Sequence, residues 1–277
     1  MADEFIFKDG GIPREKLEKA GELIANHSTV LLYNKQPFAS GTFVKCGYRF
    51  GILTAYHAIE PFNFIPNVTD QLGISTAKYE HTLLIEMQYL NPIKFPYTEK
   101  YGDPDMVFLE ILDQSKLSWI KEFRSFWEVS SEDVVSMITE CCSNSDSLWA
   151  ISGLPQSLKE EKQSEGGFDR VIGLPLQVYF GGIERRFEAN GFDYIEMMAN
   201  YESTDPMPDS FVGISGGGLW KIPMSIHRKD LRALMFGNPV LFGLQFCQTP
   251  IEGNSRRLRC HGCKSLNSLF KIVLKDG

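Results

Sequence analysis

Residues 213–220 read GISGGGLW, a serine enclosed by glycines and followed by an apolar pair. Glycines let a backbone approach a substrate closely, and they leave amide N–H groups free to face a developing negative charge. The segment therefore predicts a nucleophilic serine on a tight loop. Taken alone, the same residues also suit an ordinary turn, so their interpretation depends on the rest of the chain.

A histidine and an aspartate lie upstream, each beside a strand-like apolar run. His57 follows FGILTA at residues 50–55, and Asp105 precedes MVFLEI at residues 106–111. Each has an ordinary explanation, since histidines often end strands and aspartates often occupy turns before them. Asp103 is an alternative acidic residue in the same turn.

Together, the segments around His57, Asp105 and Ser215 resemble those of trypsin-like serine peptidases of the chymotrypsin fold, in an intracellular bacterial-type branch. The order histidine, aspartate, serine is that of the family, and the likeness extends over residues 28–274. The segments that carry it are ILTAYH (52–57), DMVFL (105–109), SLWAISGLP (147–155) and GISGGGL (213–219).

The resemblance implies a serine endopeptidase that works through an acyl-enzyme. Ser215 would attack the scissile carbonyl, and His57 would take its proton and then pass it to the leaving amine. Asp105 would hold the imidazole in the correct tautomer. The backbone N–H groups of Gly213 and Ser215 would form the oxyanion hole.

Short apolar or alternating runs divided by Gly, Pro and Asn predict a mainly β protein. The resemblance implies one peptidase domain over residues 1–277 with two six-stranded antiparallel β-barrels. Gly181-Gly182 and the AlaAsnGly of residues 189–191 predict two tight hairpins. The expected parts are an N-terminal helical extension (1–27), a first barrel (28–113), a helical connection (114–145), a second barrel (146–264) and a C-terminal helix (265–277).

Composition excludes several classes of function. A formal net charge of −7 argues against a nucleic-acid binder, because phosphate contacts need a basic surface. No apolar run approaches the length of a membrane span. The first residues, MADEFIFKDGG, are acidic where a signal peptide would be basic, so we expect a cytoplasmic location and no membrane partner.

The six cysteines are expected to be free thiols in such a compartment. Cys260 and Cys263 have the spacing of half a zinc site, but no second pair of ligands accompanies them. A buried strand is the better interpretation. We therefore expect neither a metal nor a cofactor.

Ile214 and Asp209, both upstream of Ser215, bear on activation and specificity respectively. Ile214 replaces the aspartate that, in secreted digestive members, pairs with a newly cut N-terminus, so packing or a protein partner must order the loop. Asp209 stands where trypsin-type members place an aspartate at the base of the specificity pocket. It implies cleavage of a protein or peptide substrate after Arg or Lys, although the opposite wall, residues 246–249, would narrow that pocket.

Two other readings stay open. An α/β-hydrolase would use the same serine in a strand–turn–helix elbow, with Asp230 and His261 as its partners. The glycines after Ser215 are poor helix formers, and the upstream chain lacks βαβ alternation. A non-catalytic peptide-binding module on a peptidase fold is the second alternative.

Overall fold

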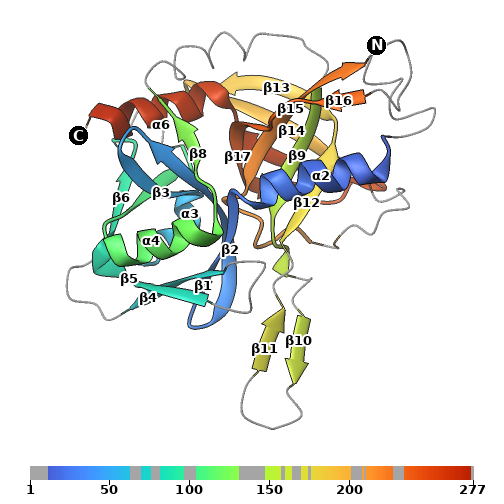
Figure 1. Cartoon of the computed structure of the whole chain (residues 1–277). Helices are drawn as coiled ribbons and strands as arrows, with labels where there is room; N and C mark the ends of the chain where they lie inside the picture. The colour runs from blue at the N-terminus through green and yellow to red at the C-terminus, as the bar shows by residue number, and fades with distance from the viewer. Residues whose placement is uncertain are drawn as a thin grey trace.

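The computed structural model describes residues 12–62, 70–75, 82–96, 104–130, 147–156, 160–163, 170–173, 176–200, 208, 210–226 and 234–275. Their strands form two large, curled sheets that lie side by side (Figure 1). Almost all strand pairs are antiparallel. The predicted mainly β fold is confirmed, and two curled antiparallel sheets stand where two barrels were predicted.

The first sheet has the strand order β5-β4-β1-β2-β3-β7-β6, and β8 pairs with β2 in parallel. Most consecutive residues of β1, β2, β4 and β7 are buried, so these strands are covered on both faces. Its strands are β1 (Ser28–Tyr33), β2 (Gln36–Cys46), β3 (Arg49–Thr54), β4 (Gln71–Ser75), β5 (Thr82–Glu86), β6 (Leu90–Lys94), β7 (Val107–Ile111) and β8 (Trp127–Val129).

The second sheet has the order β12-β9-β15-β17-β18-β14-β13, and β16 pairs with β15. A separate two-stranded ribbon, β10 (Glu160–Gln163) with β11 (Arg170–Gly173), projects from the body (Figure 1). The strands of the second sheet are β9 (Ser147–Gly153), β12 (Gln177–Gly181), β13 (Ile183–Ala189), β14 (Phe192–Asn200), β15 (Gly218–Ile226), β16 (Leu234–Phe236), β17 (Val240–Gln248) and β18 (Ser255–His261).

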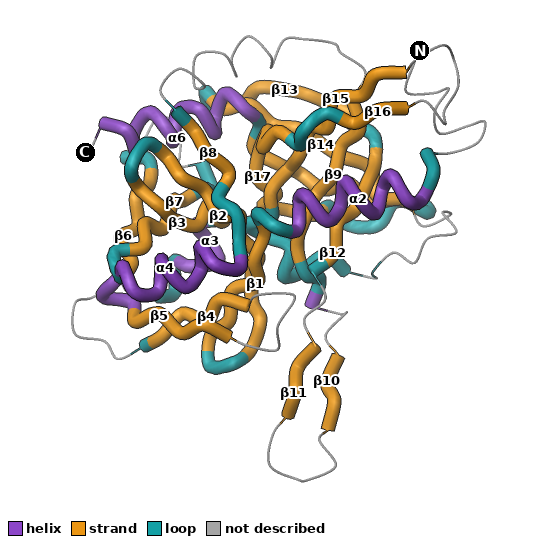
Figure 2. Tube along the Cα trace, in the orientation of Figure 1, coloured by secondary structure: helices purple, strands orange, loops and turns teal. Residues whose placement is uncertain are grey.

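The helices lie on the outside of the sheets (Figure 2). Asp193 on β14 accepts hydrogen bonds from the backbone N–H of Ser265 (2.7 Å) and Lys264 (3.1 Å), which caps the start of α6. Asp113 caps α4 in the same way. The helices are α2 (Arg14–Ala25), α3 (Tyr56–Ile59), α4 (Gln114–Phe123), the short 3₁₀ turn η1 (Met87–Tyr89) and α6 (Cys263–Lys275).

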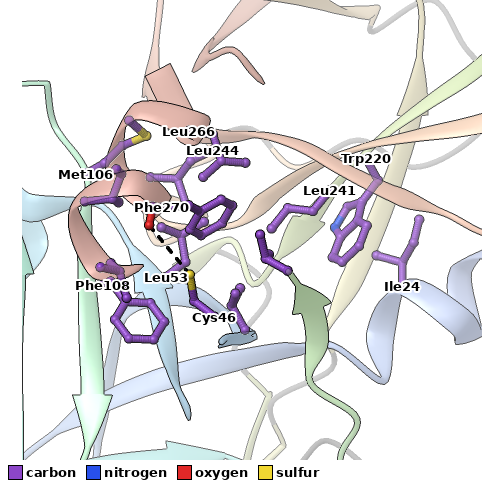
Figure 3. Close-up of a cluster of buried hydrophobic side chains, with 14 of the residues drawn as sticks. Ile24, Cys46, Leu53, Met106, Phe108, Trp220, Leu241, Leu244, Leu266 and Phe270 are labelled. Atoms are coloured by element: carbon purple, nitrogen blue, oxygen red, sulfur yellow. Dashed lines mark hydrogen bonds between the residues drawn. The ribbon is translucent and has the colours of Figure 1, made fainter. Parts of the chain in front are cut away.

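One hydrophobic cluster joins both sheets to the terminal helices (Figure 3). Phe108 from β7, Trp220 from β15 and Phe270 from α6 are all fully buried in it. The thiol of Cys46 on β2 lies 3.8 Å from the carbonyl oxygen of Phe270. Helix α6 therefore holds the two sheets together from one side.

The structure also corrects several expectations. Each sheet has eight strands rather than six. Trp127, within the expected helical connection (114–145), begins β8, because residues after α4 become extended and pair with β2 at Val44. Gly181-Gly182 does not form a hairpin, since β12 pairs with β9 and β13 pairs with β14. The second predicted hairpin is confirmed, with Asn190 (φ 53°) and Gly191 (φ 79°) in its turn.

Cys263 is disulfide-bonded, so the expectation of six free thiols is wrong at that position. Cys46, Cys247 and Cys260 are free. No helix in the described part of the chain is long and apolar enough to cross a bilayer.

Candidate active site

A cleft of about 660 Å³ is lined by residues of both sheets. The first sheet contributes an aromatic wall, in which the ring of Phe62 lies 4.6 Å from that of Tyr33 and 5.2 Å from that of Phe38. His57 lies beside this wall, and Ser215 lines the cleft from the second-sheet side. The predicted histidine and serine therefore open onto one cavity.

His57 and Asp105 are in direct contact. The imidazole Nδ1 of His57 lies 2.5 Å from Oδ2 of Asp105, and the backbone N–H of His57 donates to Oδ1 at 2.7 Å. The antiparallel pairing of β3 with β7 explains the contact, because Thr54 lies opposite Val107. His57 follows the end of β3 and Asp105 precedes the start of β7, so the two residues meet at the same edge of the sheet. These two hydrogen bonds to one carboxylate fix the orientation of the His57 ring. When Nδ1 donates to the carboxylate, Nε2 of the neutral imidazole is left as an acceptor.

The hydrogen bond that the imidazole donates to Asp105 raises the pKa of His57 above its ordinary value of 6.5, against an opposing effect of burial. A general base works only when neutral, so any hydrolysis that needs His57 must fail on the acid side of this pKa. We expect the acid limb of kcat/KM to have its midpoint above pH 6.5. An Asp105→Asn variant should move the midpoint downward; an unchanged midpoint would contradict the assigned contact.

The backbone of residues 211–217, here called the serine loop, is almost fully hydrogen-bonded. Its carbonyls bond to neighbours: Val212 accepts from Gln156 N (2.6 Å), and Ile214 accepts from Gly217 N (2.8 Å). Gly213 (φ 96°) has a backbone conformation that residues with a side chain rarely adopt. The loop is thus a single defined conformation, supported from several sides.

Two N–H groups of the serine loop donate no hydrogen bond within the described residues, those of Gly213 and Ser215. In a trans peptide the N–H points opposite to the preceding carbonyl. Because the Val212 and Ile214 carbonyls are held within the protein, both N–H groups face away from those anchors. Both residues line the cleft. A buried donor without a partner is rare in proteins, so the pair is suited to receive a ligand oxygen.

The hydroxyl of Ser215 does not contact the imidazole. Its Oγ lies 3.4 Å from the carbonyl oxygen of Phe246, and no hydrogen bond joins it to His57 in the described part of the chain. The structure therefore brings together His57 with Asp105 and places Ser215 in the same cleft. The hydrogen bond between Ser215 and His57, which the predicted triad requires, is not formed among the described residues.

Two further residues support the site from within, in roles that no motif indicated. Ser40 on β2 is completely buried, and its Oγ donates to the carbonyl oxygen of Gly213 at 2.8 Å. His261 at the end of β18 accepts a hydrogen bond from the backbone N–H of Asp105 at 3.1 Å. Both lie far from their partners in sequence and in ordinary strand positions, so nothing in the local sequence indicates them.

Burial lowers the pKa of His261 to about 4, from an ordinary value of 6.5. Its folded-state pKa is depressed, so the unfolded chain binds this proton first as the pH falls. We expect His261 to cost stability progressively from pH 6.5 down to about pH 4, by roughly 3 kcal/mol in total. Urea unfolding of wild type against His261→Gln checks this, because the variant should lose stability less steeply; parallel pH curves would argue against it.

The predicted specificity residue Asp209 and the alternative acid Asp103 lie outside the described residues. Gln248 lines the cleft opposite the aromatic wall. Its side chain accepts from the backbone N–H of Phe211 (2.8 Å) and donates to Ser210 Oγ (3.2 Å). Arg256 also donates to the same Gln248 oxygen. Phe246, Cys247 and Gln248 of the expected opposite wall line the cleft.

The elbow of an α/β-hydrolase is contradicted by the structure. The chain after Ser215 forms the strand β15 rather than a helix. His261 is 1% exposed, and it contacts Asp105 instead of the serine. Asp230 lies outside the described residues. Among the residues described, no group of three His, Cys, Asp or Glu side chains is arranged to hold a metal ion.

Comparisons with known proteins give little further help. No protein-family model matches the chain, and no curated protein matches it. Among solved structures, the chain is similar to Rv3671c from M. tuberculosis H37Rv, crystallised as a serine-to-alanine mutant in an inactive form. The TM-score is 0.48 at 10% identity, over 96% of this chain and 95% of that one. A likeness this distant leaves the function to be argued from the residues themselves.

Proposed function

We propose that the protein is a serine endopeptidase in which Ser215, His57 and Asp105 form the catalytic triad. Ser215 Oγ attacks the scissile carbonyl while His57 takes its proton, which gives an acyl-enzyme and returns the proton to the leaving amine. Water, activated by the same imidazole, then hydrolyses the ester. Asp105 keeps Nδ1 protonated and stabilises the imidazolium that forms.

The two unbonded N–H groups of Gly213 and Ser215 carry this proposal. They lie in the cleft, on a loop whose other N–H groups are all bonded. Donors held in this way would stabilise the oxyanion of a tetrahedral intermediate, and in related hydrolases each donor contributes roughly 3–4 kcal/mol to that state. A module that only binds peptides has no need of such a pair in the same cleft as a carboxylate–imidazole contact.

Substrate binding or a protein partner is proposed to complete the triad. The hydroxyl of Ser215 now faces the Phe246 carbonyl, at a long distance of 3.4 Å. A peptide strand or a partner that engages this carbonyl would release the hydroxyl toward His57. Full activity of the purified, isolated protein on short peptides would count against a partner.

Cleavage after Arg or Lys is proposed from Asp209 alone. The aromatic wall around Phe62 favours peptides with apolar side chains on the His57 side of the cleft, where the leaving amine must sit to receive its proton. We expect Asp209→Ala to lose any preference for a basic residue before the cut, by about 10-fold or more in kcat/KM. Cleavage-site profiling of a peptide library with both proteins measures this; identical profiles would eliminate the role of Asp209.

A cytoplasmic location also stays a proposal. The Cys263 disulfide disagrees with it, because disulfides persist mainly in oxidising compartments. No nucleic-acid or membrane partner and no cofactor is proposed.

Covalent labelling tests the proposed activity most directly. A fluorophosphonate probe reacts only with a serine that is activated by a base and supported by an oxyanion hole. We expect wild type to be labelled at Ser215, as mapped by peptide mass spectrometry, and Ser215→Ala to be unlabelled. Absence of labelling under every condition, with substrate peptides and cell extract included, would favour the peptide-binding module instead.

A further inference from the structure

The serine loop needs an anchor that the familiar ion pair cannot supply. Ile214 has no charge, and its side chain is fully buried in the core cluster of the second sheet. Packing holds this side chain, but packing alone does not fix the rotation of the peptide groups on either side of it. The peptide after Ile214 carries the Ser215 donor, and the peptide before Gly213 carries the other donor. The carbonyls of these two peptides, those of Ile214 and Val212, accept from the N–H groups of Gly217 and Gln156.

Ser40 holds the peptide group that follows each of the two donor residues. Its Oγ donates to the carbonyl oxygen of Gly213 at 2.8 Å, and its backbone N–H donates to the carbonyl oxygen of Ser215 at 2.9 Å. The same Oγ accepts from the backbone N–H of Leu154 at 3.0 Å. One residue of the first sheet thus holds the carbonyl of both donor residues on the second-sheet side.

The geometry also ties the loop to the general base. The carbonyl oxygen of Ser40 accepts a hydrogen bond from Thr54 Oγ1 at 2.8 Å. Thr54 ends β3, and α3 with His57 begins two residues later. Ser40 is therefore bonded both to the serine loop and to the strand that positions the imidazole. All of its polar atoms are used, inside a completely buried position.

We propose that Ser40 is the positioning residue that sets the oxyanion donors, in the role that the ion pair of a cut N-terminus has in secreted peptidases. This proposal rests on the proposed peptidase function and assigns its mode of activation. The donors are ordered within the chain, so no proteolytic cut is required to form them. Any partner acts on the Ser215 hydroxyl and not on the oxyanion hole.

The test compares Ser40→Ala with Ser28→Ala. Ser28 is a matched control, because it is 1% exposed and its Oγ also bridges the two sheets, by donating to Ser152 Oγ at 2.8 Å, away from the cleft. Four quantities are measured on each protein: the thermal midpoint, kcat, KM for a cleaved peptide, and Ki for a peptide aldehyde. The aldehyde forms a tetrahedral adduct whose oxygen occupies the oxyanion hole.

We expect the two variants to lose similar thermal stability but to differ in catalysis. Ser40→Ala should lower kcat by about 100-fold with KM within about threefold, because a small misplacement of donors is costly to the transition state. Its aldehyde Ki should rise by a similar factor. Ser28→Ala should keep both values near wild type. Wild-type kinetics in folded Ser40→Ala, or equal losses in both variants, would overturn the proposal, whereas an inactive and unlabelled wild type would instead refute the peptidase function.

Discussion

Replacing His57 by alanine is expected to lower kcat for peptide hydrolysis by roughly 10⁴–10⁶-fold, with a much smaller change in KM. The imidazole is the only group bonded to Asp105 that can accept a proton from a cleft-facing nucleophile, as far as the described residues show. Without it, the hydroxyl of Ser215 keeps its proton and is a poor nucleophile. Progress curves on a cleaved peptide, at high enzyme concentration, measure the residual rate.

His27→Ala is the control for loss of an imidazole. The His27 ring stacks on Trp220 and its Nδ1 lies 3.0 Å from the Ser125 carbonyl, outside the cleft. This variant should lose stability and keep kcat within a few-fold. If His57→Ala retained a tenth of the wild-type rate, the base would have to be another residue, and the assigned triad would be wrong.

Replacing Gly216 by alanine is expected to destabilise the protein by about 3 kcal/mol or more, enough to unfold a marginally stable domain. A β-carbon there would lie 2.1 Å from Thr54 Oγ1 and 2.2 Å from the carbonyl oxygen of Ser40. The backbone φ of 91° adds strain for any residue other than glycine. The sheets must therefore separate locally or the serine loop must move.

Gly182→Ala is the matched control, since a β-carbon at Gly182 meets no atom within 4 Å and the residue has no positive φ. Urea unfolding followed by tryptophan fluorescence gives the free energy of unfolding for both variants. We expect Gly182→Ala to stay within about 0.5 kcal/mol of wild type. A Gly216→Ala protein of the same stability would mean that the sheets are less closely packed at this point than the structure indicates.

The strands were predictable where short apolar or alternating runs are divided by Gly, Pro and Asn. The run of residues 28–33 became β1, and the C-terminal helix pattern became α6. The predictions failed where a strand pairs with a segment that is distant in the sequence. Gly181-Gly182 has the composition of a hairpin, but β12 and β13 pair with other strands, and no local signal encodes that choice.

The same distinction applies to the site. His57 and Asp105 could be predicted because each has a local sequence pattern, and strand pairing brings the two together. Ser40 and His261 could not, because their contacts lie 173 and 156 residues away and depend on how the two sheets pack. The orientation of the Ser215 hydroxyl toward Phe246 is equally invisible in sequence, since it depends on a single side-chain rotation.

The candidate site is divided between the two sheets, and this division affects how the protein loses activity. His57 follows β3 and Asp105 precedes β7 of the first sheet, and the serine loop precedes β15 of the second. A slip of about 1 Å between the sheets would separate base from nucleophile while every strand kept its own hydrogen bonds. Activity should therefore disappear at lower urea concentration than the β signal in circular dichroism. Under the proposed function, activity is therefore lost while the strands are still folded.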